Sequence, residues 1–198
     1  MKWVRITNTA ITVNGTPVAH EASDIEMLKE IYKREIANYP KFYKMDPLSQ
    51  LGFVASEMLL QQESPRLIDI ESRAVILLNR SSSLCDDKKY QSTIQTPSAY
   101  FPSPAVFVYT LPNIVTGEIS IRNKYYGETL FCVSSAFDAK EIVALAHEAF
   151  QDETTTSVLT GWLECDIDGN LDALLLLADK DDPDLNEEKI TQLYNNKS

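Results

Sequence analysis

Hydrophobic positions along the chain form short runs of two kinds, and both predict strands. Residues 3–6 and 10–13 alternate apolar and polar side chains and precede an Asn-Gly pair, which predicts two opening strands and a turn. Residues 74–78 are continuously apolar, which is typical of a strand that is covered on both faces. Residues 157–165 and 171–178 flank an Asp-Gly pair and predict a β-hairpin.

Apolar residues at helical spacing predict two helices between the early strands. Ser23 and Glu26 have the spacing of a capping box, at the start of a helix that extends to about residue 37. Asp46 followed by Pro47 has the character of an N-cap, at the start of a second helix that extends to about residue 61. Helices therefore alternate with strands, as in an α/β protein.

The longest patterned stretch is residues 102–164. It predicts helix, turn, helix, short strand, tight turn, helix and strand, in that order. Residues 85–102 before it are polar and predict a loop. Residues 79–83, which follow the apolar strand, lack the glycines of a phosphate-binding loop and predict a turn cap. Residues 179–198 are strongly acidic and predict a solubilising tail with at most one exposed helix. We therefore expect one domain over residues 1–178.

Composition narrows the class of partner and the compartment. The 198 residues are 44% hydrophobic, which suits one globular core. A formal charge of −11, without a basic patch, argues against nucleic acid and anionic membranes as partners. The three cysteines have neither CxxC nor zinc-ligand spacing, which indicates buried thiols in a reducing compartment and predicts no metal and no cofactor. No signal peptide or spanning segment is visible, so we expect a cytoplasmic protein without a membrane partner.

Several short motifs occur in an order and spacing that resemble those of one family. They are residues 45–49 (MDPLS), residues 107–121 (FVYTLPNIVTGEISI), Gly127, and residues 161–164 (GWLE). Together they resemble the N-terminal half of the β-ketoacyl synthases, which are condensing enzymes with a thiolase-like fold. The resemblance covers most of residues 1–178 and implies a layered thiolase-like half-fold, in which a mixed sheet is flanked by helices.

The resemblance also implies that the catalytic centre is missing. In that family the catalytic cysteine lies in the turn after the short central strand, and in this chain Ala136 takes its position. Active members carry two histidines and a lysine in a C-terminal half, and the chain ends before that half. The resemblance therefore implies a subunit that is not catalytic by itself.

Two residues near Ala136 are weaker alternatives for a nucleophile. Cys132 lies within the predicted short strand, where we expect a buried thiol. Ser135, like its neighbour Ser134, would need a base within hydrogen-bonding reach. His20 lies in a polar loop, and His147 lies more than ~12 Å from Ser135 along the following helix, so serine catalysis is not expected.

The resemblance implies a surface for pairing with a second subunit. In the family the two subunits join through the central strand, here residues 129–133, and helices in the region of residues 104–124 pack at the same interface. Residues of the helix-to-helix turn reach toward the acyl tunnel of the partner. By this correspondence the dimer and tunnel residues are Tyr109, Leu111, Pro112, Asn113, Thr129, Leu130, Phe131, Cys132, Val133 and Phe137.

These points lead to one leading hypothesis and two alternatives. The leading one is a non-catalytic, chain-length-factor-like subunit that pairs with an active β-ketoacyl synthase, works with an acyl carrier protein, and shapes the acyl tunnel in the synthesis of a polyene or another specialised fatty chain. The first alternative is a free-standing thiolase-like acyltransferase or hydrolase. The second is a homodimeric binding module without an acyl role.

Overall fold

The computed structural model describes residues 1–63 and 69–196, so residues 197 and 198 of the predicted tail lie outside the described part. Its strands form one seven-stranded sheet in the order β3-β2-β1-β7-β6-β4-β5. The strands are β1 (Lys2–Thr7), β2 (Ala10–Val13), β3 (Thr16–Pro17), β4 (Arg73–Asn79), β5 (Thr129–Val133), β6 (Ser157–Cys165) and β7 (Leu171–Asp179). The first strand pairs antiparallel with both β2 and β7, which places the first and the last strand of the chain side by side in the sheet.

The sheet is mixed because β6 joins two halves of different kinds. It pairs antiparallel with β7 and parallel with β4, and β4 in turn pairs parallel with β5. The predicted hairpin is confirmed, and its turn has Gly169 at a φ of +84°, which glycine adopts without strain. All seven residues of β4 are buried, as the continuous apolar run predicts for a strand covered on both faces.

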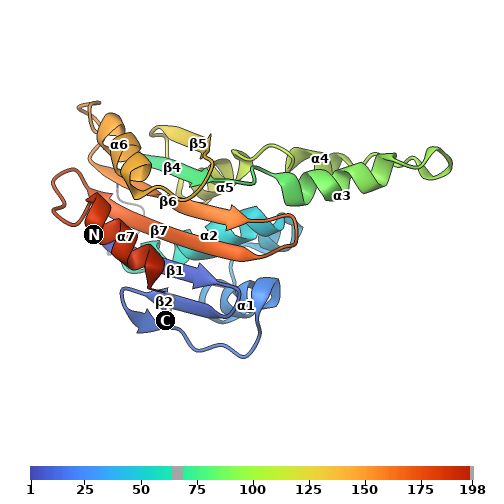
Figure 1. Cartoon of the computed structure of the whole chain (residues 1–198), viewed down its shortest axis with the longest axis horizontal. Coiled ribbons are helices and arrows are strands. Elements are labelled where there is room, and N and C mark those ends of the chain that lie inside the picture. Colours follow the sequence, from blue (N-terminus) through green and yellow to red (C-terminus); the bar gives the residue numbers. More distant parts are fainter. Residues whose placement is uncertain (64–68, 197–198) are drawn as a thin grey trace.

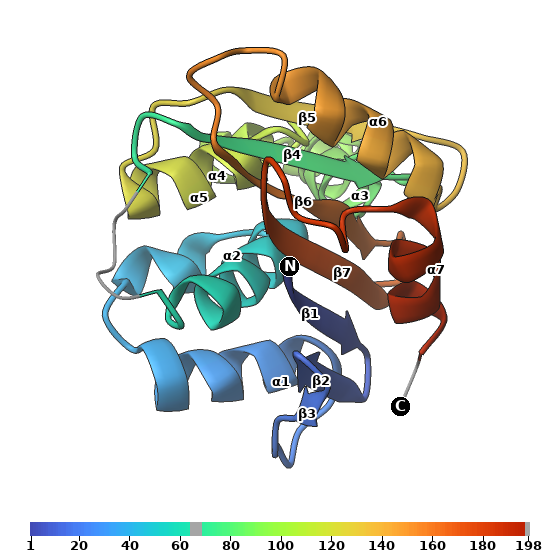
Figure 2. The same cartoon turned by 90° about the vertical axis from the view of Figure 1, so that its left-hand side faces the viewer.

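Helices cover both faces of the sheet (Figure 2). One face carries α1 (Asp24–Ile31), which continues through a π-helical turn η1 (Tyr32–Ile36), a 3₁₀ turn η2 (Pro40–Lys44), α2 (Pro47–Leu60) and α5 (Ile114–Asn123). The other face carries α6 (Ala139–Ala149) and α7 (Glu187–Asn195). Each face has its own apolar core, so the protein has three layers, helices, sheet and helices, as the predicted α/β class requires.

The helix α2 is the centre of the first core. Twelve of its residues are buried, because it packs against the sheet and against neighbouring helices at once. The predicted N-cap is confirmed, since the carboxylate of Asp46 accepts from the N–H groups of Leu48 and Ser49. Gly52 lets α2 approach α5 and the sheet, because a Cβ at this position would lie 2.4 Å from Val115 and 2.9 Å from Leu163.

An arm extends from the body between β4 and β5 (Figure 1). It consists of α3 (Leu84–Ile94), a short 3₁₀ turn η3 (Pro97–Ala99) and α4 (Pro104–Val108). The prediction of a loop over residues 85–102 is therefore wrong for most of its length. The helix was missed because α3 is mainly polar and buries only Asp86 among its residues, so it lacks an apolar stripe.

Two further local predictions were wrong. The first helix begins as expected, but Ser23 makes no capping bond to its backbone and donates to the carboxylate of Asp24 instead. The helix of the acidic segment is not fully exposed, because Ile190 and Leu193 of α7 are buried in the second core. The sequence pattern did not predict the burial of α7, because its apolar residues are few and are flanked by charged ones.

Candidate functional site

The turn between β5 and α6 is the place where the sequence analysis sought a nucleophile. Its start is fixed by Ser134, whose N–H donates to Asn79 at 2.8 Å and whose hydroxyl donates to Glu141 at 2.6 Å. Its end is fixed by Asp138, which caps α6 by accepting from the N–H groups of Lys140 and Glu141. The predicted strand, tight turn and helix are therefore confirmed.

The nucleophile candidates differ in their surroundings. Ser135 and Ala136 are exposed at the tip of this turn, while the hydroxyl of Ser134 is engaged with a carboxylate. Cys132 is half-buried against the second core, and burial, together with the charge of Glu141, raises the pKa of its thiol. A thiol with a raised pKa is mostly protonated at neutral pH and is a poor nucleophile.

The structure brings together two cysteines that lie far apart in the sequence. Cys165 at the end of β6 is buried, and Cys85 at the start of α3 packs against the same core. A hydrogen bond between the two thiols lowers the pKa of Cys85 to about 7 and raises the pKa of Cys165. Sequence reasoning missed this contact because it depends on the helix α3, which the pattern did not reveal.

A cavity of about 370 Å³ opens beside Ala136. It lies between the β5–α6 turn, the end of β6 and α7, and its lining residues are Arg80, Ala136, Phe137, Trp162, Glu164, Asp172, Thr191, Tyr194 and Asn195. Phe137 stacks on Tyr194, with ring centroids 3.6 Å apart, and meets Trp162 edge to face at 6.0 Å. The C-terminal helix therefore forms one wall of the cavity.

Glu164 connects the cavity to the loop after β4. Its Oε2 accepts from the N–H groups of Arg80 at 2.7 Å and Ser81 at 3.3 Å. In the same loop Asn79 and Ser82 exchange two hydrogen bonds, so the interpretation of residues 79–83 as a turn cap is confirmed. The second oxygen of Glu164, Oε1, is buried and has no hydrogen-bond partner in the described part of the chain.

A polar network joins α7 to the sheet next to this cavity. Tyr194 donates its hydroxyl to Asp172, which also forms an ion pair with Arg5 at 2.6 Å. The guanidinium of Arg5 lies over the Tyr194 ring, 4.7 Å from its centroid. Burial and the neighbouring Asp172 raise the pKa of Tyr194, so its hydroxyl stays protonated and donates.

Some glycines in the motifs that resemble the β-ketoacyl synthases are explained by close backbone contacts. Gly161 has a φ of +143°, and a Cβ there would lie 2.0 Å from the carbonyl oxygen of Leu174 on the neighbouring strand. At Gly127 a Cβ would lie 2.3 Å from the carbonyl oxygen of Arg73. Gly117 has open space around it, so packing does not require a glycine there.

The residues expected at a dimer surface lie in two groups, except Phe137, which is half-buried in the wall of the cavity beside Ala136. The strand β5 is the last in the sheet, with Thr129 and Val133 exposed and its three central residues half-buried. In the turn between α4 and α5, Leu111 and Asn113 are exposed and Pro112 is half-buried. Tyr109 differs from the expectation, because it is buried in the first core and donates its hydroxyl to Glu118.

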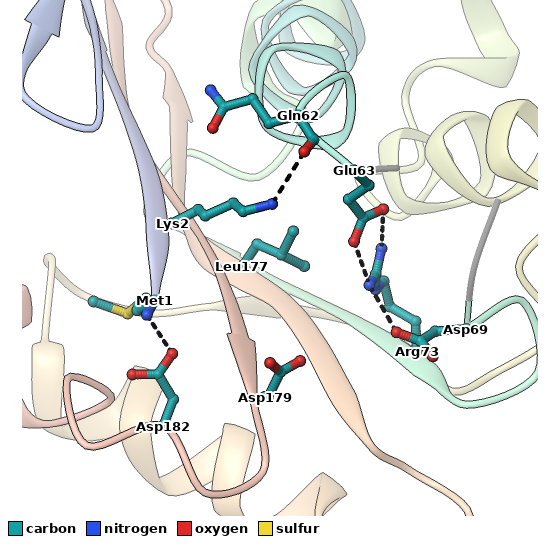
Figure 3. A pocket seen from close by; sticks show the side chains of 9 residues that line it. All are labelled: Met1, Lys2, Gln62, Glu63, Asp69, Arg73, Leu177, Asp179 and Asp182. Carbon is teal, nitrogen blue, oxygen red and sulfur yellow. Dashed lines mark hydrogen bonds and ion pairs between the residues drawn. The ribbon is translucent and has the colours of Figure 1, made fainter. Parts of the chain in front are cut away.

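A second hollow, of about 470 Å³, lies away from this turn (Figure 3). Most of the charged groups that line it are already paired with one another. Arg73 binds Glu63 and Asp69, Met1 pairs through its ammonium with Asp182, and Lys2 donates to the carbonyl of Gln62. The hollow therefore offers few free polar groups to a ligand, and the cavity beside Ala136 is the better candidate.

Comparisons with known proteins identify the fold. The structure is similar to the ishigamide ketosynthase/chain length factor, with a TM-score of 0.66 and 15% identity over 92% of this chain and 62% of that chain. It is also similar to the ketosynthase ApeO in complex with its chain length factor ApeC from Xenorhabdus doucetiae, with a TM-score of 0.57 and 14% identity over 92% of this chain and 81% of that one. A third similar structure is AntDE:AntF, a type II PKS acyl-carrier protein in complex with its ketosynthase bound to the hexaketide. Its TM-score is 0.54, with 14% identity over 93% of this chain and 65% of that one.

The similarity lies in structure. No family model matches the chain, and no curated protein matches it by sequence. The chain spans less than two thirds of the length of two of the three similar chains, 62% and 65%. It has the thiolase-like fold of ketosynthases and chain length factors, and the predicted fold class is confirmed. Within the described residues, no helix combines the length and apolar character needed to cross a bilayer.

Proposed function

We propose that this chain is a non-catalytic β-ketoacyl-ACP synthase-like subunit that pairs with an active condensing enzyme and shapes its acyl tunnel, in the manner of a chain length factor. The observation that carries the proposal is the β5–α6 turn, which presents Ala136 on a fold shared with ketosynthases. Without a thiolate at this position the subunit forms no acyl-enzyme. The subunit then contributes to the complex through the shape that it gives to the acyl tunnel.

The free edge of β5 supports the pairing. Val75 donates to the carbonyl of Glu128 and Ser134 donates to the carbonyl of Asn79, each at 2.8 Å, so the even-numbered positions of β5 bond to β4. The N–H and C=O groups of Thr129, Phe131 and Val133 therefore point away from the sheet. A free edge of this kind pairs readily with a strand of another subunit.

The turn between α4 and α5 supports the tunnel role. Leu111 is 51% exposed although it is apolar, and Pro112 next to it fixes the backbone. Buried polar contacts below the turn hold it in place, since Tyr109 donates to Glu118 and Glu118 also pairs with Lys41 at 2.6 Å. A rigid apolar bump at the wall of a tunnel limits chain length, because each methylene that it excludes or admits is worth roughly 1 to 3 kcal/mol.

The wider setting belongs to the same proposal. The partners would be an active synthase and an acyl carrier protein in the cytoplasm, and the product would be a polyene or another specialised fatty chain. The support is the similarity to chain length factors in complex with ketosynthases, and to one complex with an acyl-carrier protein.

The test is the length of the product. The synthase co-purified with this chain would be assayed with its carrier protein, with the wild-type chain, without it, and with Leu111→Ala. We expect the Leu111→Ala complex to release products longer by one or more elongation steps, because the smaller side chain leaves room for them. Ile167→Ala is the matched control, since Ile167 is also exposed but lies in the β6–β7 turn. Identical products with and without the chain would refute the proposal.

The two alternatives make different predictions. A free-standing enzyme needs an activated nucleophile, and iodoacetamide would then label Cys132 rapidly at neutral pH. The raised pKa of this thiol favours slow labelling instead. A homodimeric module would use the same free edge of β5 for a second copy of the chain, and pull-down with the synthase would then yield the homodimer alone.

A further inference from the structure

The two cysteines that meet between α3 and β6 take no part in the proposed pairing with a synthase. Cys165 is the last residue of β6, and it is 1% exposed within the first core. Cys85 lies in the first turn of α3, is half-buried, and packs against the same core. Because α3 begins the arm, the two cysteines meet where the arm joins the body (Figure 1).

The third cysteine lies on the opposite face of the sheet. Successive side chains of a strand point to opposite faces, and in β5 Phe131 packs against the first core. Its neighbours Leu130 and Cys132 pack against the second core instead. The sheet therefore separates Cys132 from the other two thiols, and Cys85 with Cys165 is the one pairing that the fold allows within the chain.

The sulfur atoms of this pair are already close to each other. The two thiols form a hydrogen bond, so small rotations of the side chains bring the sulfurs toward the length of an S–S bond. The first turn of α3 can adjust to such a change, because its N-cap residue, Ser83, makes no side-chain hydrogen bond to the helix backbone. The geometry therefore suits a covalent bond between Cys85 and Cys165.

Cys85 is the thiol that an oxidant attacks first. The hydrogen bond from Cys165 lowers the pKa of Cys85 to about 7, against the opposing effects of burial and of two nearby carboxylates. Roughly half of this thiol is therefore ionised at neutral pH, and a thiolate at the start of a helix reacts readily with peroxides. Cys132 is less reactive, because burial raises the pKa of its thiol.

We propose that Cys85 and Cys165 form a reversible disulfide when a peroxide oxidises the protein, and that this bond ties the start of the arm to the sheet. The Cys85 thiolate attacks one oxygen of hydrogen peroxide, becomes a sulfenic acid and releases hydroxide, which is protonated to water. The Cys165 thiol then attacks the sulfur of Cys85, gives up its proton and displaces the second oxygen as water. Two thiols are oxidised to one disulfide, and one peroxide is reduced to two waters. Two molecules of glutathione reverse the step and leave as their own disulfide.

The bond would act on both ends of the arm. Ser83, two residues before Cys85, donates its hydroxyl to the carbonyl of Thr110 at 2.6 Å, and thereby joins the start of α3 to the residues that follow α4. A cross-link from Cys85 to β6 therefore limits local opening where the arm leaves the body and where it returns. We expect the backbone amides of α3 to exchange with solvent about tenfold more slowly after oxidation.

The experiment uses the full chain, first reduced and then treated with hydrogen peroxide at neutral pH. After denaturation, N-ethylmaleimide labels the free thiols and mass spectrometry counts them. We expect the count to fall from three to one, and the tryptic peptides that contain Cys85 and Cys165 to be joined. Glutathione should restore all three thiols. Hydrogen exchange of the reduced and oxidised forms then measures the effect on α3.

Three serine variants assign the role of each thiol. Cys165→Ser removes the second thiol of the pair, so the sulfenic acid at Cys85 should persist and react with dimedone. Cys85→Ser should prevent both dimedone labelling and the cross-link. Cys132→Ser makes the same chemical change on the opposite face of the sheet, and the disulfide should form in it at the wild-type rate. In the wild-type chain we expect peroxide to oxidise Cys132 about fivefold more slowly than Cys85, or slower still.

The outcome is decisive in either direction. The proposal is overturned if more than one thiol stays free after peroxide, if the cross-link includes Cys132 or joins two chains, if glutathione does not reverse it, or if exchange in α3 is unchanged. The peptide map of the wild-type chain needs no variant, so it decides the question even where a serine variant folds poorly. Neither Cys85 nor Cys165 belongs to the proposed pairing surface, so the failure of the disulfide would leave the tunnel proposal intact. Unchanged product lengths in the tunnel experiment would likewise leave the disulfide standing.

Discussion

The two edges of the sheet contrast in length and in chemistry. At one edge, β3 has only two residues, both exposed, and one of them is Pro17. At the other edge, β5 has five residues, mostly apolar, with neither a proline nor a charged residue among them. Short edge strands and prolines are common devices against unwanted strand pairing. The β3 edge is therefore blocked, while the β5 edge keeps the features of a pairing surface.

The contrast extends to the two halves of the sheet. Strands β1, β2, β3 and β7 pair antiparallel, and short turns join β1 to β2 and β2 to β3, whereas β4 and β5 pair parallel and are separated in the chain by the arm and α5. Most of the exposed large apolar residues also belong to the segment from the end of β4 to the end of β5, in a set that includes Phe107, Val108, Leu111, Tyr126 and Val133.

The largest effect is expected where β5 begins. Gly127→Ala would set a Cβ 2.3 Å from the carbonyl oxygen of Arg73, which is backbone and has little freedom to move. We expect a loss of about 3 kcal/mol in the free energy of unfolding, measured by urea denaturation monitored by circular dichroism.

Gly117→Ala is the control for this change. Its Cβ would meet open space within α5, so we expect a gain of about 0.5 to 1 kcal/mol from the better helix propensity of alanine. Equal stabilities for the two variants would mean that the backbone at the start of β5 is not held as tightly as the contact distance implies.

A charge at each edge tests whether the edges differ in association. Val133→Lys adds a cation to an exposed position of β5. We expect it to weaken the complex with the synthase by about 2 kcal/mol, or about thirtyfold in Kd, because the lysine is desolvated at the interface. Surface plasmon resonance with the immobilised synthase measures this Kd.

The matched variant is Thr16→Lys, which adds the same charge to β3 at an exposed position. It should change Kd less than about twofold, since the β3 edge takes no part in the proposed pairing. If Thr16→Lys weakens the complex as much as Val133→Lys, the assignment of association to the β5 edge is wrong.

The smallest effect concerns the arm, which leaves the sheet beside β4. Asp86 in α3 is 2% exposed, and its Oδ2 is buried without a hydrogen-bond partner in the described chain. Burial, helped by the negative charge of Asp46, raises the pKa of Asp86 to about 6. The folded state therefore holds this proton more strongly than the unfolded state does.

The sign of the pH effect follows from this difference. Stability that protonated Asp86 contributes near pH 4 is lost as the pH rises toward 6, and little more is lost above. We expect Asp86→Asn to raise the free energy of unfolding at pH 7 by on the order of 1 kcal/mol and to change it little at pH 4. Asp181→Asn alters the net charge equally at an exposed site. If it reproduces the effect in urea titrations at both pH values, burial of Asp86 is not the cause.

Much of the fold could be predicted because the buried residues of a strand or helix follow a pattern that can be read from the sequence. The strand β4 and the β6–β7 hairpin are runs of apolar residues, and the N-cap of α2 is recognised from the adjacent residues Asp46 and Pro47. The arm could not be predicted in this way. Its helix α3 projects from the body, so its side chains carry no apolar stripe to recognise.

The candidate site was predicted only in part, for a similar reason. The turn that bears Ala136 is local, and the resemblance to the condensing enzymes pointed to it directly. The free oxygen of Glu164 and the aromatic wall of the cavity arise from contacts among β6, α7 and the loop after β4. Tyr109 was expected at the dimer and tunnel surface, but its hydroxyl donates to Glu118 in α5. A single sequence does not reveal that the two residues are partners.

The placement of β1 between β2 and β7 has a consequence for biosynthesis. Because β1 hydrogen-bonds to residues 172–177, this ladder of the sheet cannot form until residue 177 has left the ribosome. Until then the N-terminal hairpin leaves one edge of β1 unpaired. We therefore expect nascent chains halted before residue 170 to recruit chaperones, and chains that extend beyond β7 to release them.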